Sequence, residues 1–307
     1  MKLPQYKSIE DKELCFPDRY QKIDTIQKLD SWVKEILEPN EETKKTKLRK
    51  FIFRGMKEAK YKIYTSAQRY YITHDLTNSS ICLGNLIKAQ IDALEGVKNG
   101  KKRKNILPRY YQSLGVETTD LLYLSFAQHY GGISPLIDFT RNIRKAFYFM
   151  TANVCFPSEG AEDIDNYSSI YYLSVEEYQQ VISQKKNIDI KKLLSFEEMR
   201  DSPLVITDKV LYVVKPNGKT KVISFSNLNI ILQEGCFVYY YNPEDELAPL
   251  EKEVQCVDIH KSLIPYIQSK IMKYNGVTIK REDMFATGEN IIKESLKRVA
   301  TDIVQIP

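Results

Sequence analysis

Residues 121–151 read LLYLSFAQHYGGISPLIDFTRNIRKAFYFMT, and this stretch decides the fold. Its first part predicts a helix with an apolar side, which Thr119 or Asp120 caps and Gly131-Gly132 ends. Leu136–Phe139 follows as a short apolar run between polar residues, which is typical of a buried strand. Apolar residues then recur at helical spacing, so a second helix packs on a core. These apolar positions are Ile143, Ala146, Phe147 and Met150.

The joint between the strand and the second helix carries polar residues. Asp138, Thr140, Arg141 and Asn142 lie where the strand ends and the helix begins. Free backbone N–H groups and the positive end of the helix dipole meet there. Arg141 and Arg144 lie near the first turn, where the dipole disfavours cations, and this pattern indicates a bound anion. The alternative is a capped helix with two solvated arginines, and the spacing alone leaves both open.

Helices are predicted on both sides of this stretch, and residues 1–20 are expected to form an irregular arm. Spacing of apolar residues, together with Pro and Gly at the ends, sets their bounds. The expected helices are Ile23–Leu37, Ser79–Val97, Val175–Gln184, Lys261–Tyr274 and Gly288–Ile303.

Strands dominate the second half of the chain. The pattern predicts an α+β fold with a mixed or antiparallel sheet core, a helical N-terminal region and closing C-terminal helices. The expected strands are Phe51–Phe53, which Arg54-Gly55 closes, Ser168–Val175, Val210–Val214, Lys221–Phe225, Cys236–Tyr241 and, as an edge strand, Val254–Ile259.

Composition limits the class of protein. The five cysteines are scattered without a C-x-x-C pair, and the three histidines lack ligand spacing, so we expect a reducing compartment and no metal site. No apolar run is long enough to span a membrane, which predicts a cytoplasmic protein without a membrane partner. The net charge of +5 permits a polyanionic partner. The basic runs Lys44–Lys50 and Lys101–Lys104 are either solvated surface or contacts to nucleic acid.

Three segments together resemble the FRG domain family. The first is Phe53-Arg54-Gly55, followed by Ser66 and Arg69. The second runs from Ala127 through His129 and Tyr130 to Phe149. The third contains Gln233, Gly235 and Phe237. The resemblance covers roughly residues 45–300, and it implies an N-terminal arm and helix over residues 1–45 and an FRG domain over residues 46–307.

The order of these motifs is similar to that of ADP-ribosyltransferases, which consume NAD. This second resemblance implies that Arg54-Gly55 engages NAD, with the glycine backbone on the nicotinamide amide and the arginine on a phosphate or ribose. Ser66, Arg69, Tyr130, Thr140 and Arg141 would complete the NAD-binding set. A pyrophosphate suits a guanidinium and a helix N-terminus.

Cleavage of the glycosidic bond of NAD builds positive charge on the ribose, so a nearby carboxylate lowers the barrier. The residue at the family position is the neutral Gln233, and its neighbour Glu234 would point to the opposite face of a strand. Unless a bulge turns Glu234, Asp138 is the best-placed acid. The chemistry therefore leaves Gln233, Glu234 and Asp138 open for this role.

His129 and Arg54 each have two interpretations. His129 either bonds a ribose hydroxyl or acts as a base near neutral pH, or it only caps the helix before Gly131. Arg54 either binds the ligand or forms a buried salt bridge to Asp138 that holds two strands together.

Two functions of different classes follow. The first is an NAD-dependent ADP-ribosyltransferase or NAD glycohydrolase, as a toxin or anti-phage defence effector that modifies nucleic acid (RNA or DNA) or protein and is held by an antitoxin or inhibitor protein. The second is a non-catalytic FRG module that binds a nucleotide or a protein and regulates.

Overall fold

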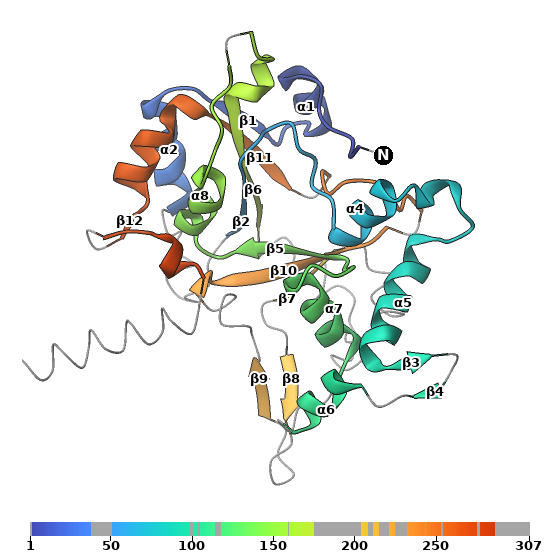
Figure 1. The fold of residues 1–307 in the computed structure, drawn as a ribbon. Coiled ribbons are helices and arrows are strands. Elements are labelled where there is room, and N and C mark those ends of the chain that lie inside the picture. Colours follow the sequence, from blue (N-terminus) through green and yellow to red (C-terminus); the bar gives the residue numbers. More distant parts are fainter. Residues whose placement is uncertain are drawn as a thin grey trace, which may run out of the picture.

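The computed structural model describes residues 2–37, 51–98, 101–102, 105–113, 118–158, 160–174, 204–207, 211–214, 221–224, 232–242, 244–252, 254–274 and 277–285. Within this part the chain is α+β, with one sheet of seven strands in the order β1-β11-β6-β2-β5-β10-β7 (Figure 1). The β1–β11 pair is parallel and the other neighbours are antiparallel, so the sheet is mixed as predicted. The strands are β1 Tyr20–Ile23, β2 Phe51–Met56, β5 Leu136–Thr140, β6 Tyr167–Ser174, β7 Leu204–Thr207, β10 Gly235–Tyr240 and β11 Gln255–His260.

Three further pairs of strands lie outside this sheet. The predicted hairpin near residue 217 has its strands as β8 Leu211–Val214 and β9 Lys221–Ser224, which pair antiparallel. The expected charged loop Lys101–Lys104 begins instead with β4 Lys101–Lys102, which pairs with β3 Val97–Lys98. The remaining pair is β12 Lys273–Tyr274 with β13 Val277–Thr278.

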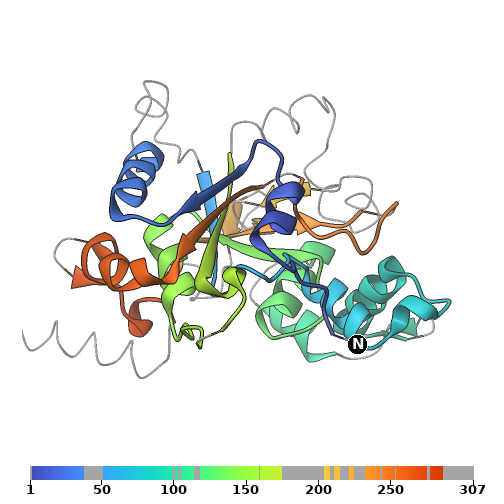
Figure 2. The same ribbon diagram turned by 90° about the horizontal axis from the view of Figure 1, so that it is seen from above.

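Two groups of helices cover one face of the sheet. Trp32 of α2 and Phe147 of α8 pack with the segment from Lys261 to Ile271 on the half that contains β2, β6 and β11. Helices α4, α5 and α7 pack on the half that contains β5 and β10. Figures 1 and 2 both show these groups on opposite sides of the molecule. The α-helices are α1 Ile9–Cys15, α2 Ile26–Leu37, α4 Ser66–Thr73, α5 Leu83–Glu95, α6 Ile106–Ser113, α7 Asp120–His129, α8 Ile143–Thr151 and α12 Ile264–Tyr266.

Short turns of 3-10 and π helix complete the described part. The C-terminal segment predicted as one helix over Lys261–Tyr274 is helical only to Ile271 and then enters β12. The 3-10 turns are η1 Leu76–Asn78, η2 Asp163–Asn166, η4 Lys261–Leu263 and η6 Arg281–Asp283, and η5 Ile267–Ile271 is a π turn.

The stretch from residue 121 to residue 151 has the predicted structure. Thr119 caps α7 by accepting a hydrogen bond from the Leu122 N–H, and Gly131 adopts a φ of +77° just after the helix. β5 follows as a buried strand in which only Asp138 is exposed. α8 then buries the four apolar residues expected to face the core, with Ala146, Phe147 and Met150 at 0% exposure. Periodicity was sufficient here because both helices and the strand pack on the core of one sheet.

Gly55 lets α8 contact β2 directly. A Cβ at this position would lie 2.0 Å from the main-chain oxygen of Ala146 and 2.8 Å from the nitrogen of Met150. No side chain fits there unless the helix moves, so the glycine of the Phe53-Arg54-Gly55 tripeptide has a packing reason. This position is also inside the ladder, because Gly55 pairs with Ile170 of β6.

The prediction of an irregular arm over residues 1–20 is wrong. Ser8 caps α1, whose residues Ile9 and Lys12 are buried, and Tyr20 begins β1. β1 pairs with β11, so the first residues complete the sheet. The same contact corrects the expected edge strand Val254–Ile259, since β11 lies between β1 and β6.

Other differences are smaller. The predicted helix Ser79–Val97 begins later, at Leu83, and α6 and β7 were not predicted. None of the helices in the described ranges is long and apolar enough to cross a membrane. The predicted helices Val175–Gln184 and Gly288–Ile303 and the basic run Lys44–Lys50 lie outside the described residues. The expected boundary at residue 45 also falls there and stays a prediction.

Candidate functional site

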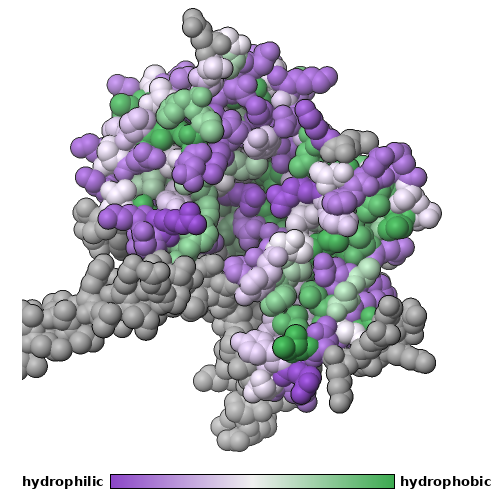
Figure 3. Space-filling model, in the orientation of Figure 1, coloured by the Kyte–Doolittle hydropathy of each residue, from purple (hydrophilic) through white to green (hydrophobic). Residues whose placement is uncertain are grey.

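The candidate site lies where the sheet divides. β2 and β5 share one residue pair, Phe53 with Thr140. Beyond it β2 continues along β6 as far as Met56, while β5 continues along β10 to Leu136. Figure 3 shows the surface hollowed between the two groups of helices, with hydrophilic residues inside the hollow. A gap between two strands therefore opens next to Arg54.

The position of Arg54 corrects one expectation. The tripeptide was expected to end a strand at Phe53, but Arg54 and Gly55 are inside β2, paired with Tyr171 and Ile170 of β6. β2 separates from β5 there without ending. The arginine thus extends from an ordered strand into the gap.

The guanidinium of Arg54 is mostly without protein partners. Its NH1 group donates to the main-chain oxygen of Asp138 at 2.7 Å, and this bond spans the gap between β2 and β5. Its Nε atom is buried and has no hydrogen-bond partner in the described part of the chain. A guanidinium carries five N–H donors, and unpaired donors near a protein interior are costly. This arginine is therefore suited to an acceptor from outside the protein.

Asp138 is the centre of the cluster. Its Oδ2 atom accepts a hydrogen bond of 2.6 Å from Gln128 Nε2, so the expected salt bridge with Arg54 is replaced by the bond to the main-chain oxygen. Ser66 donates to Gln128 Oε1 at 3.2 Å. Four predicted residues are thus brought together around this carboxylate. They are Arg54, Arg69, Ser66 and His129, the arginines and the histidine through its charge.

Local sequence explains why α4 presents Ser66 and Arg69 here. Thr65 and Gln68 form a capping box, in which each side chain bonds the other residue's backbone N–H. The Gln68 amide also donates to the main-chain oxygens of Glu246 and Ala248, which fixes the helix against the β10 end of the sheet. Ser66 donates in addition to the oxygen of Gly132, so α4 is tied to the turn after α7.

Burial and charge set the protonation of the cluster. Burial lowers the pKa of His129, and the carboxylate of Asp138 opposes this shift only in part. Because the ordinary value is near 6.5, a lowered pKa makes His129 neutral at pH 7. Burial also lowers the pKa of Arg54, while Asp138 raises it and Arg69 lowers it. Arginine keeps its proton under such shifts, so two cations share one carboxylate.

The remaining predicted residues form a second group at the N-terminus of α8. The hydroxyl of Thr140 donates to the oxygen of Gln233 at 2.6 Å and accepts from the Asn142 N–H, and Asn142 caps the helix. Arg141 N–H donates to the oxygen of Glu234 at 2.9 Å. The Glu234 carboxylate accepts from Asn142 Nδ2 at 2.8 Å and pairs with Lys145 at 3.2 Å. A carboxylate of the protein itself thus lies at this helix N-terminus.

The backbone places Glu234 differently from the expectation. The residue precedes β10 in a turn and has a φ of +47°, so the alternation of a strand does not apply to it. Gln233 donates from Nε2 to the oxygen of Met284 at 3.0 Å. Neither side chain has a printed contact with the Asp138 cluster in the part of the chain described. Their catalytic roles stay predictions.

Two residues complete the inventory. Tyr130 is 67% exposed and packs on Phe126 and His129. Gln128 bonds Asp138 directly and was not predicted, although it belongs to the same motif as His129; its side chain has no charge, and consecutive helix positions do not share a face. The described residues contain no group of three or more His, Cys, Asp or Glu that could hold a metal ion.

Comparison with known proteins gives one match. Residues 49–157 match the family model of the FRG domain, and this range contains the whole Asp138 cluster. Neither a search of the curated proteins nor a search of the solved structures finds a match. Over residues 49–157, from β2 to the loop after α8, the chain is an FRG domain, as the resemblance predicted.

Proposed function

We propose that the protein is an NAD-dependent ADP-ribosyltransferase, with NAD bound in the gap between β2 and β5. One observation carries the proposal: the Arg54 guanidinium enters this gap with a buried, unpartnered Nε and a single hydrogen bond to the protein. A second arginine, Arg69, lies close enough to interact with Arg54 through charge. Two guanidinium groups suit a pyrophosphate, which offers bidentate acceptors and two negative charges.

The chemistry follows from the remaining residues of the cluster. As the bond between ribose C1′ and the nicotinamide nitrogen breaks, its electron pair goes to nicotinamide and positive charge develops on the ribose. Asp138, held by Gln128, is the carboxylate that would stabilise this charge. The acceptor then forms the new bond to C1′, and neutral His129 is suited to take its proton. Water as the acceptor gives NAD hydrolysis.

The wider setting belongs to the same proposal. A sheet that divides between β2 and β5 is the feature that supports an ADP-ribosyltransferase-like fold. The acceptor is a nucleic acid or a protein, and consumption of NAD in the cytoplasm would make the enzyme a toxin or anti-phage effector. Such an activity requires an antitoxin or inhibitor protein in the producing cell.

One observation favours a second function, a non-catalytic module that binds a nucleotide. The carboxylate of Glu234 is engaged with Asn142 and Lys145, and the family-position residue Gln233 is neutral. If Asp138 serves only to orient Gln128 and the arginines, the same gap binds a nucleotide without cleaving it.

The two functions are separated by an assay of NAD consumption. Purified protein with NAD labelled in the adenylate phosphate should release nicotinamide and label protein, RNA or DNA. Asp138→Asn should lower the rate about 100-fold or more, because the carboxylate that stabilises the developing charge is lost, as for other single electrostatic groups. Glu234→Gln is the matched control: it also neutralises one carboxylate, but it should keep most of the activity.

The outcomes are distinct. Loss of activity in Glu234→Gln with full activity in Asp138→Asn would assign the acid wrongly. Nucleotide binding without turnover in the wild type would favour the non-catalytic module. The absence of both binding and turnover would contradict both functions.

A further inference from the structure

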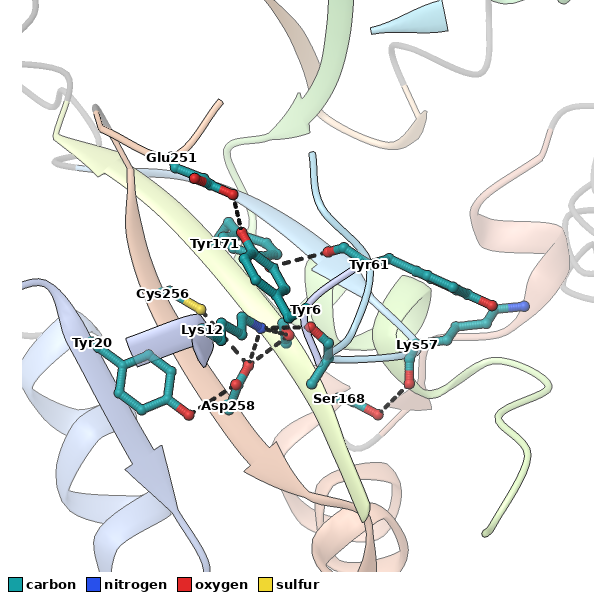
Figure 4. Close-up of polar contacts among 12 residues, drawn as sticks. Tyr6, Lys12, Tyr20, Lys57, Tyr61, Ser168, Tyr171, Glu251, Cys256 and Asp258 are labelled. Atoms are coloured by element: carbon teal, nitrogen blue, oxygen red, sulfur yellow. Dashed lines mark hydrogen bonds and ion pairs between the residues drawn. The ribbon is translucent and has the colours of Figure 1, made fainter. Parts of the chain in front are cut away.

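The N-terminal helix α1 carries a lysine that is fully buried. Lys12 is 0% exposed, and its ammonium donates to Asp258 Oδ1 at 2.6 Å, Ser169 Oγ at 2.8 Å and the oxygen of Ala59 at 2.9 Å (Figure 4). An ammonium has three donors, so all of them are used. The sequence gave no reason to expect this, since the surrounding residues of α1 are charged and exposed.

The carboxylate that receives Lys12 is equally buried. Asp258 is 0% exposed on β11, its Oδ1 also accepts from Ser169, and its Oδ2 accepts from the Tyr20 hydroxyl at 2.9 Å. The network therefore joins α1, β1, β6 and β11 at one point. Apolar residues of the same volume often stabilise a fold as well as a buried ion pair does, whereas an ion pair requires one geometry. The network thus fixes where α1 lies.

Tyr171 connects this network with the candidate site. The Lys12 ammonium lies 5.1 Å from the centre of the Tyr171 ring, and the ring of Phe16 lies 5.9 Å from it. Tyr171 is fully buried on β6 directly opposite Arg54 of β2, and opposite residues of an antiparallel pair share a face. The face of the sheet that α1 covers therefore also carries the stem of Arg54.

We infer that Lys12 is a positioning residue for Arg54: its bond to Asp258 holds α1 against Tyr171, and Tyr171 keeps the guanidinium directed into the gap between β2 and β5. The inference rests on the proposed role of Arg54 in binding a nucleotide with a pyrophosphate group. Arg54 has one hydrogen bond of its own, so packing against its stem decides its orientation. Lys12 acts without touching the ligand.

The test uses Lys12→Met, which keeps the length of the side chain and removes its charge. Calorimetric titration with ADP-ribose, at a temperature where the variant is folded, should give an affinity about tenfold weaker, the equivalent of one lost hydrogen bond to a charged group. The NMR signal of the Arg54 Nε–H group should broaden or disappear. The double variant Lys12→Met/Asp258→Leu should recover stability, because no charge is left unpaired, but not affinity.

Lys261→Met is the matched control. Lys261 is also buried and bonds Glu58 Oε2 at 2.8 Å and the oxygen of Cys155 at 2.9 Å, without contact to Tyr171. This variant should lose stability and keep both affinity and the Arg54 signal. If Lys12→Met does not fold, Ser169→Ala removes one acceptor of Lys12 and should shift affinity and signal in the same direction by a smaller amount.

Several results would overturn the inference. They are an unchanged affinity and Arg54 signal in Lys12→Met or, where that variant does not fold, in Ser169→Ala; affinity restored together with stability in the double variant; and an equal loss in Lys261→Met. If the wild type does not bind ADP-ribose, the proposed function fails. The Arg54 signal in the variants then still decides whether Lys12 orients this side chain.

Discussion

Gly55→Ala should lower the free energy of unfolding by about 3 kcal/mol, the upper end of the usual cost of adding a methylene to a packed core. The added Cβ would lie 2.0 Å from the main-chain oxygen of Ala146, and a helix backbone cannot give way as a side chain does. α8 must therefore move away from β2, which also exposes apolar surface of Phe147 and Met150. Urea denaturation of the wild type and the variant measures the difference.

Gly84→Ala is the control for this prediction. Its Cβ would lie 2.7 Å from the hydroxyl oxygen of Tyr241, which is the end of a side chain and can shift. Alanine also favours the helix α5 by about 1 kcal/mol over glycine, so the net effect should be near zero. Wild-type stability of Gly55→Ala would contradict the close contact between α8 and β2.

Arg54→Ala should weaken binding of ADP-ribose about 100-fold or more, and Arg54→Lys about tenfold, since each hydrogen bond to a charged group contributes about 1.5–3 kcal/mol. Lysine keeps the charge but loses the planar pair of donors that matches a phosphate. Alanine also leaves the oxygen of Asp138 without its donor. Calorimetry with ADP-ribose measures both variants.

Arg281→Lys provides the comparison for Arg54→Lys. The Arg281 guanidinium lies over the ring of Phe285, outside the Asp138 cluster. This variant should bind as the wild type does. Equal binding by the wild type, Arg54→Lys and Arg54→Ala would leave Arg54 with only its bond between the two strands.

The part of the fold that periodicity could predict is the part whose helices and strands have one buried and one exposed side. α7, β5 and α8 are of this kind, and Gly131 marks the turn between them. The N-terminal segment is not, because a helix with a buried Lys12 reads as a polar arm. Its partner Asp258 lies 246 positions along the chain, so no local pattern shows the pairing.

The same pair explains the error at β11. Its sequence, QCVDIH, alternates like a strand with one exposed face, and a carboxylate in the middle suggests an edge. In the structure Asp258 is buried because α1 and β1 cover it. Gly55 was interpreted as the end of β2 for a similar reason, since only the approach of α8 explains a glycine inside that strand.

The candidate site was predicted in part. Arg54, Ser66, Arg69, His129 and Asp138 came from the resemblance, and the structure brings them together. Strand alternation could not place Glu234, because a turn with positive φ precedes β10. Neither alternation nor charge pointed to Gln128, whose bond to Asp138 depends on how α7 returns to β5.

A crystal structure of the protein with ADP-ribose tests the central claim most directly. The account predicts the pyrophosphate in the gap between β2 and β5, with its oxygens within about 3 Å of the Arg54 guanidinium, the distance of a charge-assisted hydrogen bond. Arg69 should lie on the same phosphates, and the ribose that carries C1′ should face Asp138. A nucleotide bound elsewhere, with Arg54 bonded only to the oxygen of Asp138, would contradict the account.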